Sequence, residues 1–242
     1  MSLRNVFILF FLIFSFLKAD YYGPSLAESG LYSWDRQVFS LGVNSNLINS
    51  KTKSSISSLG FDISNKATLK RIGYYEEGEI YWRGRVLYNI YAYSNSKFYN
   101  MEISLGIGLK NPLKGIFVNY YAHDLSFVYK EFTNESSLSD SYFFENGKHI
   151  GFMYSLILGK NLSPKFEMAL VPFVGIFKGN ILNQESTIYT IEGVKMPMLY
   201  KKYHNVAFEY ELSYQRINAG DSLGYSISKV SFNININWKY NN

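Results

Sequence analysis

Apolar and polar residues alternate strictly over residues 229–240. Every second residue of this stretch is apolar: Val230, Phe232, Ile234, Ile236, Trp238 and Tyr240. The residues between them are lysine, serine and asparagine. Because successive side chains of a β-strand point to opposite faces, this period of two places all the apolar side chains on one face. A helix would spread both sets around its circumference, so the pattern predicts a β-strand.

The same alternation recurs along the chain, most clearly at residues 99–109 and 206–214, and turn-forming residues separate the alternating stretches. The pattern weakens at residues 182–192, which we nevertheless interpret as a strand. We therefore predict ten strands, although eight also fit the pattern. Their ranges are 36–47, 56–75, 79–94, 97–110, 114–131, 148–160, 164–178, 182–192, 198–216 and 223–240.

The predicted strands are long. Several run for twelve residues or more, whereas strands of globular proteins usually have about five or six residues. A strand that crosses a membrane at a tilt needs about nine to eleven. The 22 Tyr and 19 Phe of the chain also favour pleated sheets. We expect an all-β, antiparallel, up-and-down transmembrane β-barrel. A soluble sandwich or lipocalin-like barrel is the alternative, with its apolar face turned inward.

The N-terminal residues have the design of an export signal. Arg4 is followed by the mostly apolar run at residues 6–17, which is too short to span a bilayer as a helix, and Ala19 suits a cleavage site. We expect residues 1–19 to be a cleaved signal peptide, residues 20–35 a periplasmic leader and residues 36–242 the barrel. An uncleaved N-terminal anchor is the alternative.

With these features the chain resembles the small bacterial outer-membrane β-barrel proteins. The resemblance is one of pattern, without a subfamily motif, and it covers residues 36–240. It implies location in the outer membrane of a Gram-negative bacterium and contact with the lipid of that membrane. It also implies that the barrel-assembly machinery recognises the C-terminal strand, because Trp238-Lys239-Tyr240 resembles the aromatic ending of such strands.

If the last strand ends on the periplasmic side, the orientation of the predicted barrel in the membrane follows. The connections at 76–78, 111–113, 161–163 and 193–197 then lie on the periplasmic side, where bacterial barrels keep short turns. The longest connection, residues 132–147, lies outside the cell together with the connection near residues 48–55. Surface loops are common sites of recognition. We therefore expect external partners to be contacted there.

If the apolar face meets lipid, the polar face lines the lumen. The charged residues predicted to point inward are Arg83, Arg85, Glu102, Glu167, Glu209 and Glu211. We expect Arg85 to lie opposite Gly106 and Arg83 opposite Gly108. Because buried charges are costly unless paired, we also expect both arginines to reach carboxylates such as Glu209 and Glu211. The alternative is that the charges sit in lumen water.

Aromatic residues near the predicted strand ends suggest a girdle at the membrane interface. The members of this predicted girdle are Tyr81, Trp82, Tyr91, Tyr93, Trp238 and Tyr240.

The sequence contains little that predicts catalysis or cofactor binding. It has no cysteine and no metal-binding or phosphate-binding motif, so we expect no metal or cofactor. A net charge of +5 without a run of like charges does not indicate nucleic-acid binding. His123 is the candidate for a lipid- or peptide-modifying hydrolase, but alternation places Ser126 on the opposite face unless a bulge intervenes.

We therefore expect a non-enzymatic outer-membrane barrel with a structural or surface-interaction role. The alternatives are a narrow channel for small solutes and a barrel-embedded hydrolase centred on His123.

Overall fold

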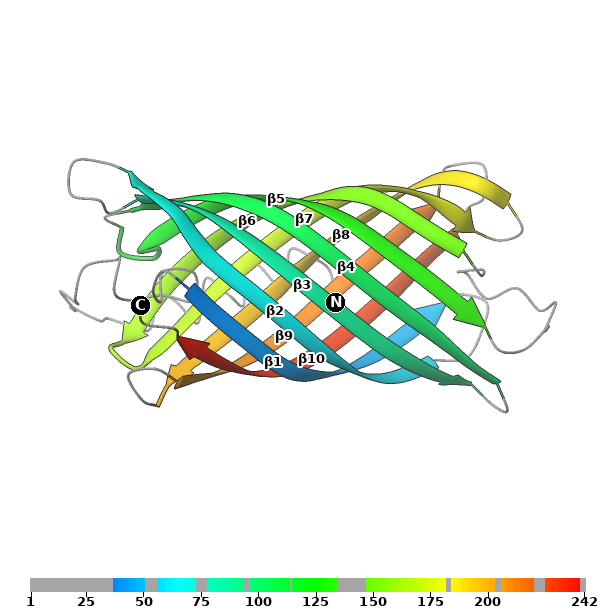
Figure 1. The fold of residues 1–242 in the computed structure, drawn as a ribbon, viewed down its shortest axis with the longest axis horizontal. Helices are drawn as coiled ribbons and strands as arrows, with labels where there is room; N and C mark the ends of the chain where they lie inside the picture. Colours follow the sequence, from blue (N-terminus) through cyan, green and yellow to red (C-terminus); the bar gives the residue numbers. More distant parts are fainter. Residues whose placement is uncertain are drawn as a thin grey trace.

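The computed structural model describes residues 37–50, 56–72, 78–93, 96–113, 115–134, 147–181, 184–202, 206–219 and 225–239. They form a closed barrel in which every strand pairs antiparallel with its neighbours in sequence and β1 pairs with β10 (Figure 1). The strands are β1 (Gln37–Ser50), β2 (Ile56–Ile72), β3 (Gly78–Tyr93), β4 (Ser96–Pro112), β5 (Tyr120–Asn134), β6 (Gly147–Ser163), β7 (Phe166–Ile181), β8 (Gln184–Lys201), β9 (Val206–Ala219) and β10 (Tyr225–Lys239). The predicted ten-stranded, up-and-down, all-β barrel is confirmed.

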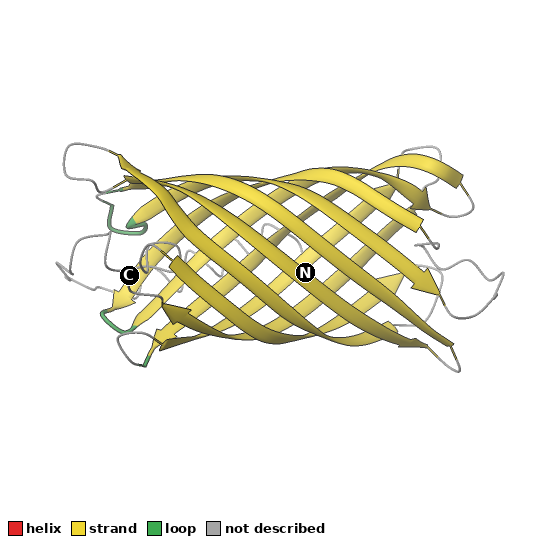
Figure 2. Cartoon of the chain, in the orientation of Figure 1, coloured by secondary structure: helices red, strands yellow, loops and turns green. Residues whose placement is uncertain are grey.

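The two ends of the barrel differ in their connections. We call the end with residues 73–77, 113–119, 164–165 and 202–205 the turn end, and the opposite end, which carries the longest connection at 135–146, the loop end. The described turns lie at the turn end (Figure 2). Among the described residues no helix is long and apolar enough to span a membrane. The predicted signal peptide and leader, residues 1–35, lie outside the described residues.

The predicted turn at residues 193–197 is wrong, and those at 111–113 and 161–163 are displaced, because the connections are at 113–119 and 164–165. Residues 193–197 lie inside β8, and the connection to β9 is at residues 202–205. The prediction left residues 193–197 as the connection between the strands 182–192 and 198–216. In the structure Gly193 is closely packed, because a Cβ at Gly193 would collide with the backbone oxygen of Tyr214 on β9 and lie 2.6 Å from the ring of Phe173 on β7. The glycine is therefore needed by packing between adjacent strands.

The outer surface of the barrel is apolar, as the alternation predicts. On β4 the outward side chains of Leu105, Ile107 and Leu109 are exposed, whereas the inward Asn100 and Ser104 are buried. The same division holds on β10, where Phe232 is exposed and its neighbours Ser231 and Asn233 are buried. The apolar face of each strand is thus the one that can meet hydrocarbon.

Inward aromatic rings pack over inward glycines of neighbouring strands. The ring of Tyr81 on β3 covers Gly108 on β4, and the ring of Tyr120 on β5 covers Gly159 on β6. A Cβ at either glycine would collide with the ring. Glycine is therefore required at these positions by the close approach of a side chain.

We expect Gly159→Val to destabilise the barrel by about 1–3 kcal/mol, the usual cost of overpacking. The valine would displace the buried Tyr120, whose hydroxyl donates a 2.6 Å hydrogen bond to Glu167. Urea unfolding of the refolded protein in vesicles measures the effect. Ser45→Val is the matched control, because Ser45 points outward on β1 and is exposed. Equal unfolding midpoints for the two variants would contradict the packing described here.

Among the described residues the lumen holds two larger apolar clusters, which we call layers, and a small third one of Val38, Leu199 and Ala207. The larger one lies near the loop end and receives buried side chains from nine strands: Ile48, Ile56, Tyr91, Phe98, Val128, Phe173, Phe177, Tyr189, Ile191, Ile217 and Ile227. A smaller one lies toward the turn end and contains Tyr81, Tyr120, Ala122, Ile157, Ala169 and Val171. The inward face is therefore only partly polar.

Candidate functional site

Several charged residues of the lumen are held in ion pairs between strands. Arg85 on β3 binds Asp62 on β2 with both carboxylate oxygens engaged: its Nε lies 2.9 Å from each oxygen, and its Nη2 also donates to Oδ2. The carboxylate is almost fully buried, and the guanidinium is mostly buried. A bidentate pair of this kind is among the stronger hydrogen-bonded interactions in proteins.

Arg83 makes a second pair that passes over a strand. Its Nη2 donates to Asp124 on β5 at 2.7 Å and to Ser126 at 3.1 Å. Gly106 on the intervening strand β4 pairs with Arg83 on one side and with Ser126 on the other. The missing side chain at Gly106 leaves the space through which the arginine reaches β5.

Further pairs lie along the lumen wall. Lys130 binds Glu102 at 3.1 Å between β5 and β4. Near the turn end, Lys201 lies 3.6 Å from Glu167 between β8 and β7. Each pair connects adjacent strands, so these charges stabilise the wall of the barrel and do not stand free in the lumen.

The register and the partners of the arginines differ from the prediction. Arg83 lies opposite Gly106 and Arg85 opposite Ser104, because Tyr93 pairs with Ser96, whereas the predicted strands would pair residue 94 with residue 97. The carboxylates bound are Asp62 and Asp124, not Glu209 and Glu211. Asp62 is on the strand next to the arginines and Asp124 is two strands away. The two glutamates belong to β9, across the barrel.

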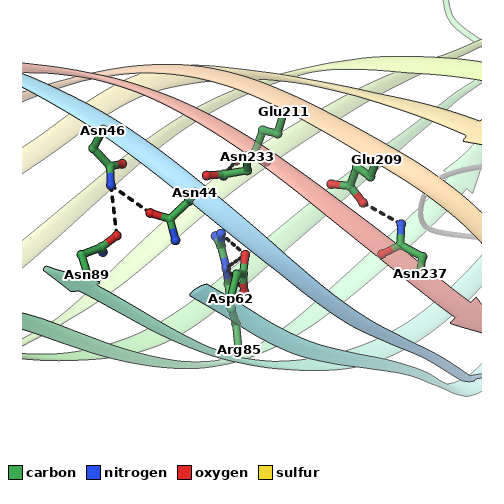
Figure 3. A network of polar contacts seen from close by, with 9 residues as sticks. All are labelled: Asn44, Asn46, Asp62, Arg85, Asn89, Glu209, Glu211, Asn233 and Asn237. Atoms are coloured by element: carbon green, nitrogen blue, oxygen red, sulfur yellow. Dashed lines mark hydrogen bonds and ion pairs between the residues drawn. The ribbon is translucent and has the colours of Figure 1, made fainter. Parts of the chain in front are cut away.

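Glu209 and Glu211 instead accept hydrogen bonds from amides of β10. Asn237 donates to Glu209 at 3.0 Å and Asn233 to Glu211 at 2.8 Å (Figure 3). Both glutamates border a cavity of about 110 Å³ that Arg83, Arg85 and Lys195 also line. This volume has room for several water molecules. It lies on the turn-end side of the larger apolar layer.

Asparagines on β1 and β3 extend the polar network along the inner wall. Asn46 donates to Asn44 at 2.9 Å and to Asn89 at 3.0 Å (Figure 3). Because β1 pairs with β10, these amides and those of Asn233 and Asn237 lie on both sides of the seam that closes the barrel.

The predicted aromatic girdle needs correction at two positions. Tyr81 and Tyr91 point into the lumen and are 0% and 2% exposed. Both occupy odd-numbered positions of β3, and the odd-numbered side chains of this strand face inward. Trp82 points outward and is exposed. Trp238 is half-buried beside Phe39. The side chain of Tyr93 and all of Tyr240 lie outside what the structure describes.

Other aromatic residues face outward and are at least partly exposed. These are Tyr121, Tyr154, Tyr200, Tyr210 and Tyr214.

His123 is separated from the polar residues near it in sequence. It lies on the outer wall, where its Nδ1 is 2.6 Å from the hydroxyl of Tyr154. Asp124 and Ser126 are buried on the inner face. The pairing of β5 with both neighbours is regular through this segment, so the bulge that would bring His123 and Ser126 together is absent from it. No group of His, Cys, Asp and Glu suited to a metal occurs among the described residues.

The fold is similar to that of known bacterial barrels. No family model matches the sequence, and the comparison with curated proteins gives no match either. The β domain of the Bordetella autotransporter BrkA superimposes with a TM-score of 0.51 at 9% identity, over 85% of this chain and 100% of that one. The translocator domain of the autotransporter NalP from Neisseria meningitidis gives 0.47 at 8% identity, over 85% and 89%.

At such low sequence identity the likeness concerns the fold alone. Together with the exposed apolar wall and the ion-paired lumen, it defines the chain as a small transmembrane β-barrel of the bacterial type.

Proposed function

We propose that the chain is a non-conducting barrel of the Gram-negative outer membrane, delivered there by its signal peptide. Its loops at the loop end contact partners outside the cell. The observation that carries this proposal is the larger apolar layer near the loop end. Nine strands contribute side chains to that layer, and each residue of the layer is at most 9% exposed.

A channel for small solutes would need a polar path from one end of the lumen to the other. The cavity beside Arg83, Arg85 and Glu209 supplies part of such a path. We infer that the larger apolar layer interrupts this path, with Lys130 over the ring of Phe177 and His149 against the ring of Tyr189. Moving an ion into a dry apolar region is costly, and hydrophobic constrictions close pores for this reason. A barrel with such a layer is better suited to support its loops than to conduct.

The proposed external surface is at the loop end. The longest connection, residues 135–146, joins β5 to β6 there. A rigid barrel is a good base for a recognition loop, because the loop can vary without disturbing the wall. The barrel-assembly machinery and outer-membrane lipid are the other partners we propose, the first through β10 and the second through the apolar wall.

A hydrolase centred on His123 has little support. Catalysis of that kind needs a nucleophile within hydrogen-bond reach of the base. Ser126 lies on the other side of the wall from His123, and the partner of His123 is Tyr154. We therefore propose that the protein is not an enzyme. Lipid A, phospholipid and peptide substrates, each tested with the wild type and with His123→Ala, should show no turnover.

Planar-bilayer recording tests the closed lumen. We expect the purified, refolded protein to insert without producing discrete current steps, because the larger apolar layer excludes hydrated ions. A porin refolded in the same detergent is the positive control. Insertion should be confirmed by the change of electrophoretic mobility on boiling. Uniform single-channel steps from the wild-type protein would favour the channel and overturn the proposal.

A further inference from the structure

The connection between β4 and β5 exposes large apolar side chains at the turn end. Ile116 is 82% exposed, and Phe117 and Leu113 are 45% and 43% exposed. The neighbouring turn between β6 and β7 presents Pro164 and Lys165 instead. Exposed apolar groups that lie close together on a surface commonly mark a site of contact.

This connection is folded against the barrel. The backbone N–H of Leu113 donates to the carbonyl of Asn119 at 2.8 Å, which closes the segment into a compact loop. Asn119 then binds β6 through both backbone and side chain: its N–H donates to Gly159, and its side-chain oxygen accepts from the N–H of Asn161. The apolar side chains are therefore held in place by a defined backbone.

The loop lies on the outer side of the wall. Gly159 faces the lumen beneath the ring of Tyr120, so the next residue, Lys160, has the outward parity. The ammonium group of Lys160 donates to the carbonyl of Ile116. The loop consequently packs beside the outward face of β6 and does not cover the lumen mouth.

The apolar outer wall continues into this loop. Leu109, near the end of β4, is exposed outward, and Tyr121 follows the loop on the outward face of β5. Together Trp82 and Tyr121 place aromatic rings near the turn end of the outer wall. Aromatic side chains concentrate at the boundary between hydrocarbon and headgroups, and Phe117 extends that set.

We propose that Leu113, Ile116 and Phe117 form a lipid foot, an apolar projection that inserts among the phospholipids of the leaflet at the turn end. The proposal rests on the membrane location proposed above. Apolar surface gains about 25 cal/mol per Å² when it leaves water, so insertion of three large side chains favours one depth of the barrel in the bilayer. The occupant of this surface is phospholipid, because the foot continues a surface that already faces lipid.

Site-directed spin labelling tests the lipid foot. The chain has no cysteine, so single-cysteine variants carry one label each. Ile116→Cys reports the foot, Lys165→Cys the neighbouring exposed turn, and Leu125→Cys the exposed middle of the wall. The variants are refolded into phosphatidylcholine vesicles, and collision rates with oxygen and with a water-soluble nickel chelate are measured.

We expect the label at residue 116 to collide more with oxygen and less with nickel than the label at 165, at a depth shallower than 125. Aqueous behaviour at 116 combined with hydrocarbon behaviour at 125 would overturn the foot while leaving the membrane barrel intact. Aqueous behaviour at 125 would overturn the membrane location itself. A label at 116 that is aqueous in vesicles but shielded in native membrane fragments would indicate a protein partner, and it would also overturn the lipid foot.

A second pair of variants tests the same surface without a label. Ile116→Asp combined with Phe117→Asp should lower the yield of refolding into vesicles several-fold relative to Lys165→Asp, while both variants refold equally in detergent micelles. Equal yields in vesicles would overturn the foot.

Discussion

Replacing Arg85 with alanine will destabilise the barrel by about 3–5 kcal/mol, the usual cost of removing one partner from a buried ion pair. The variant leaves the carboxylate of Asp62 buried without the guanidinium that engages both of its oxygens. The side chain of Asp62 is only 4% exposed, so its carboxylate loses its cationic partner in a largely desolvated place. Urea unfolding in vesicles and the temperature at which gel mobility shifts both measure the loss.

The matched control for this prediction is Arg216→Ala. Arg216 is exposed on the outward side of β9, so the same change of residue type leaves the lumen untouched. The double variant Arg85→Gln with Asp62→Asn should recover part of the stability, because it removes both charges and retains groups that can hydrogen-bond. Unfolding of Arg85→Ala at the wild-type urea concentration would show that the charges of the lumen are solvated and not paired.

The second large effect concerns the larger apolar layer. Phe177 and Tyr189 are directly opposite in the register of β7 and β8, their rings stack with centroids 5.5 Å apart, and both are 1% exposed. Truncating either to alanine should cost about 3–5 kcal/mol, as expected for a buried aromatic residue. The double variant should also admit water to the layer and raise the frequency of current steps in planar bilayers above that of the wild type.

Phe152→Ala is the control for this layer, because Phe152 is exposed on the outer wall of β6. It should be less destabilising and electrically silent. If the double alanine variant fails to refold, Phe177→Leu retains an apolar side chain, and its smaller loss of stability can be measured instead. A Phe177→Ala, Tyr189→Ala variant as stable and as silent as the wild type would contradict the assignment of the layer as the seal.

Strand faces were predictable because a period of two is a local property. On β4, β9 and β10 the residues predicted to face outward do so. The turn at residues 193–197 was misplaced because the alternation is weak at residues 182–192, so the pattern did not mark the end of that strand. Gly193 is packed against Tyr214 of β9 and Phe173 of β7, and a local pattern does not contain such contacts between strands.

The candidate site was only partly predictable. Parity correctly placed Arg83 and Arg85 in the lumen, and the same parity would have placed Asp62 there, between the outward Phe61 and Ile63. Asp124 was missed because the change of apolar parity near His123 suggested a bulge. The structure shows a regular strand with a polar His123 on its outer face.

By itself the sequence predicted the architecture: long alternating strands, ten preferred over eight, in a barrel whose apolar faces turn toward lipid. Only the tertiary structure decided which inward residues meet. The register between strands depends on which residues form each hairpin turn, and a turn one residue earlier moved Arg85 from Gly106 to Ser104. The closure of the barrel then brings side chains from nine strands into one apolar layer. Its members are far apart in sequence, so no local pattern contains it.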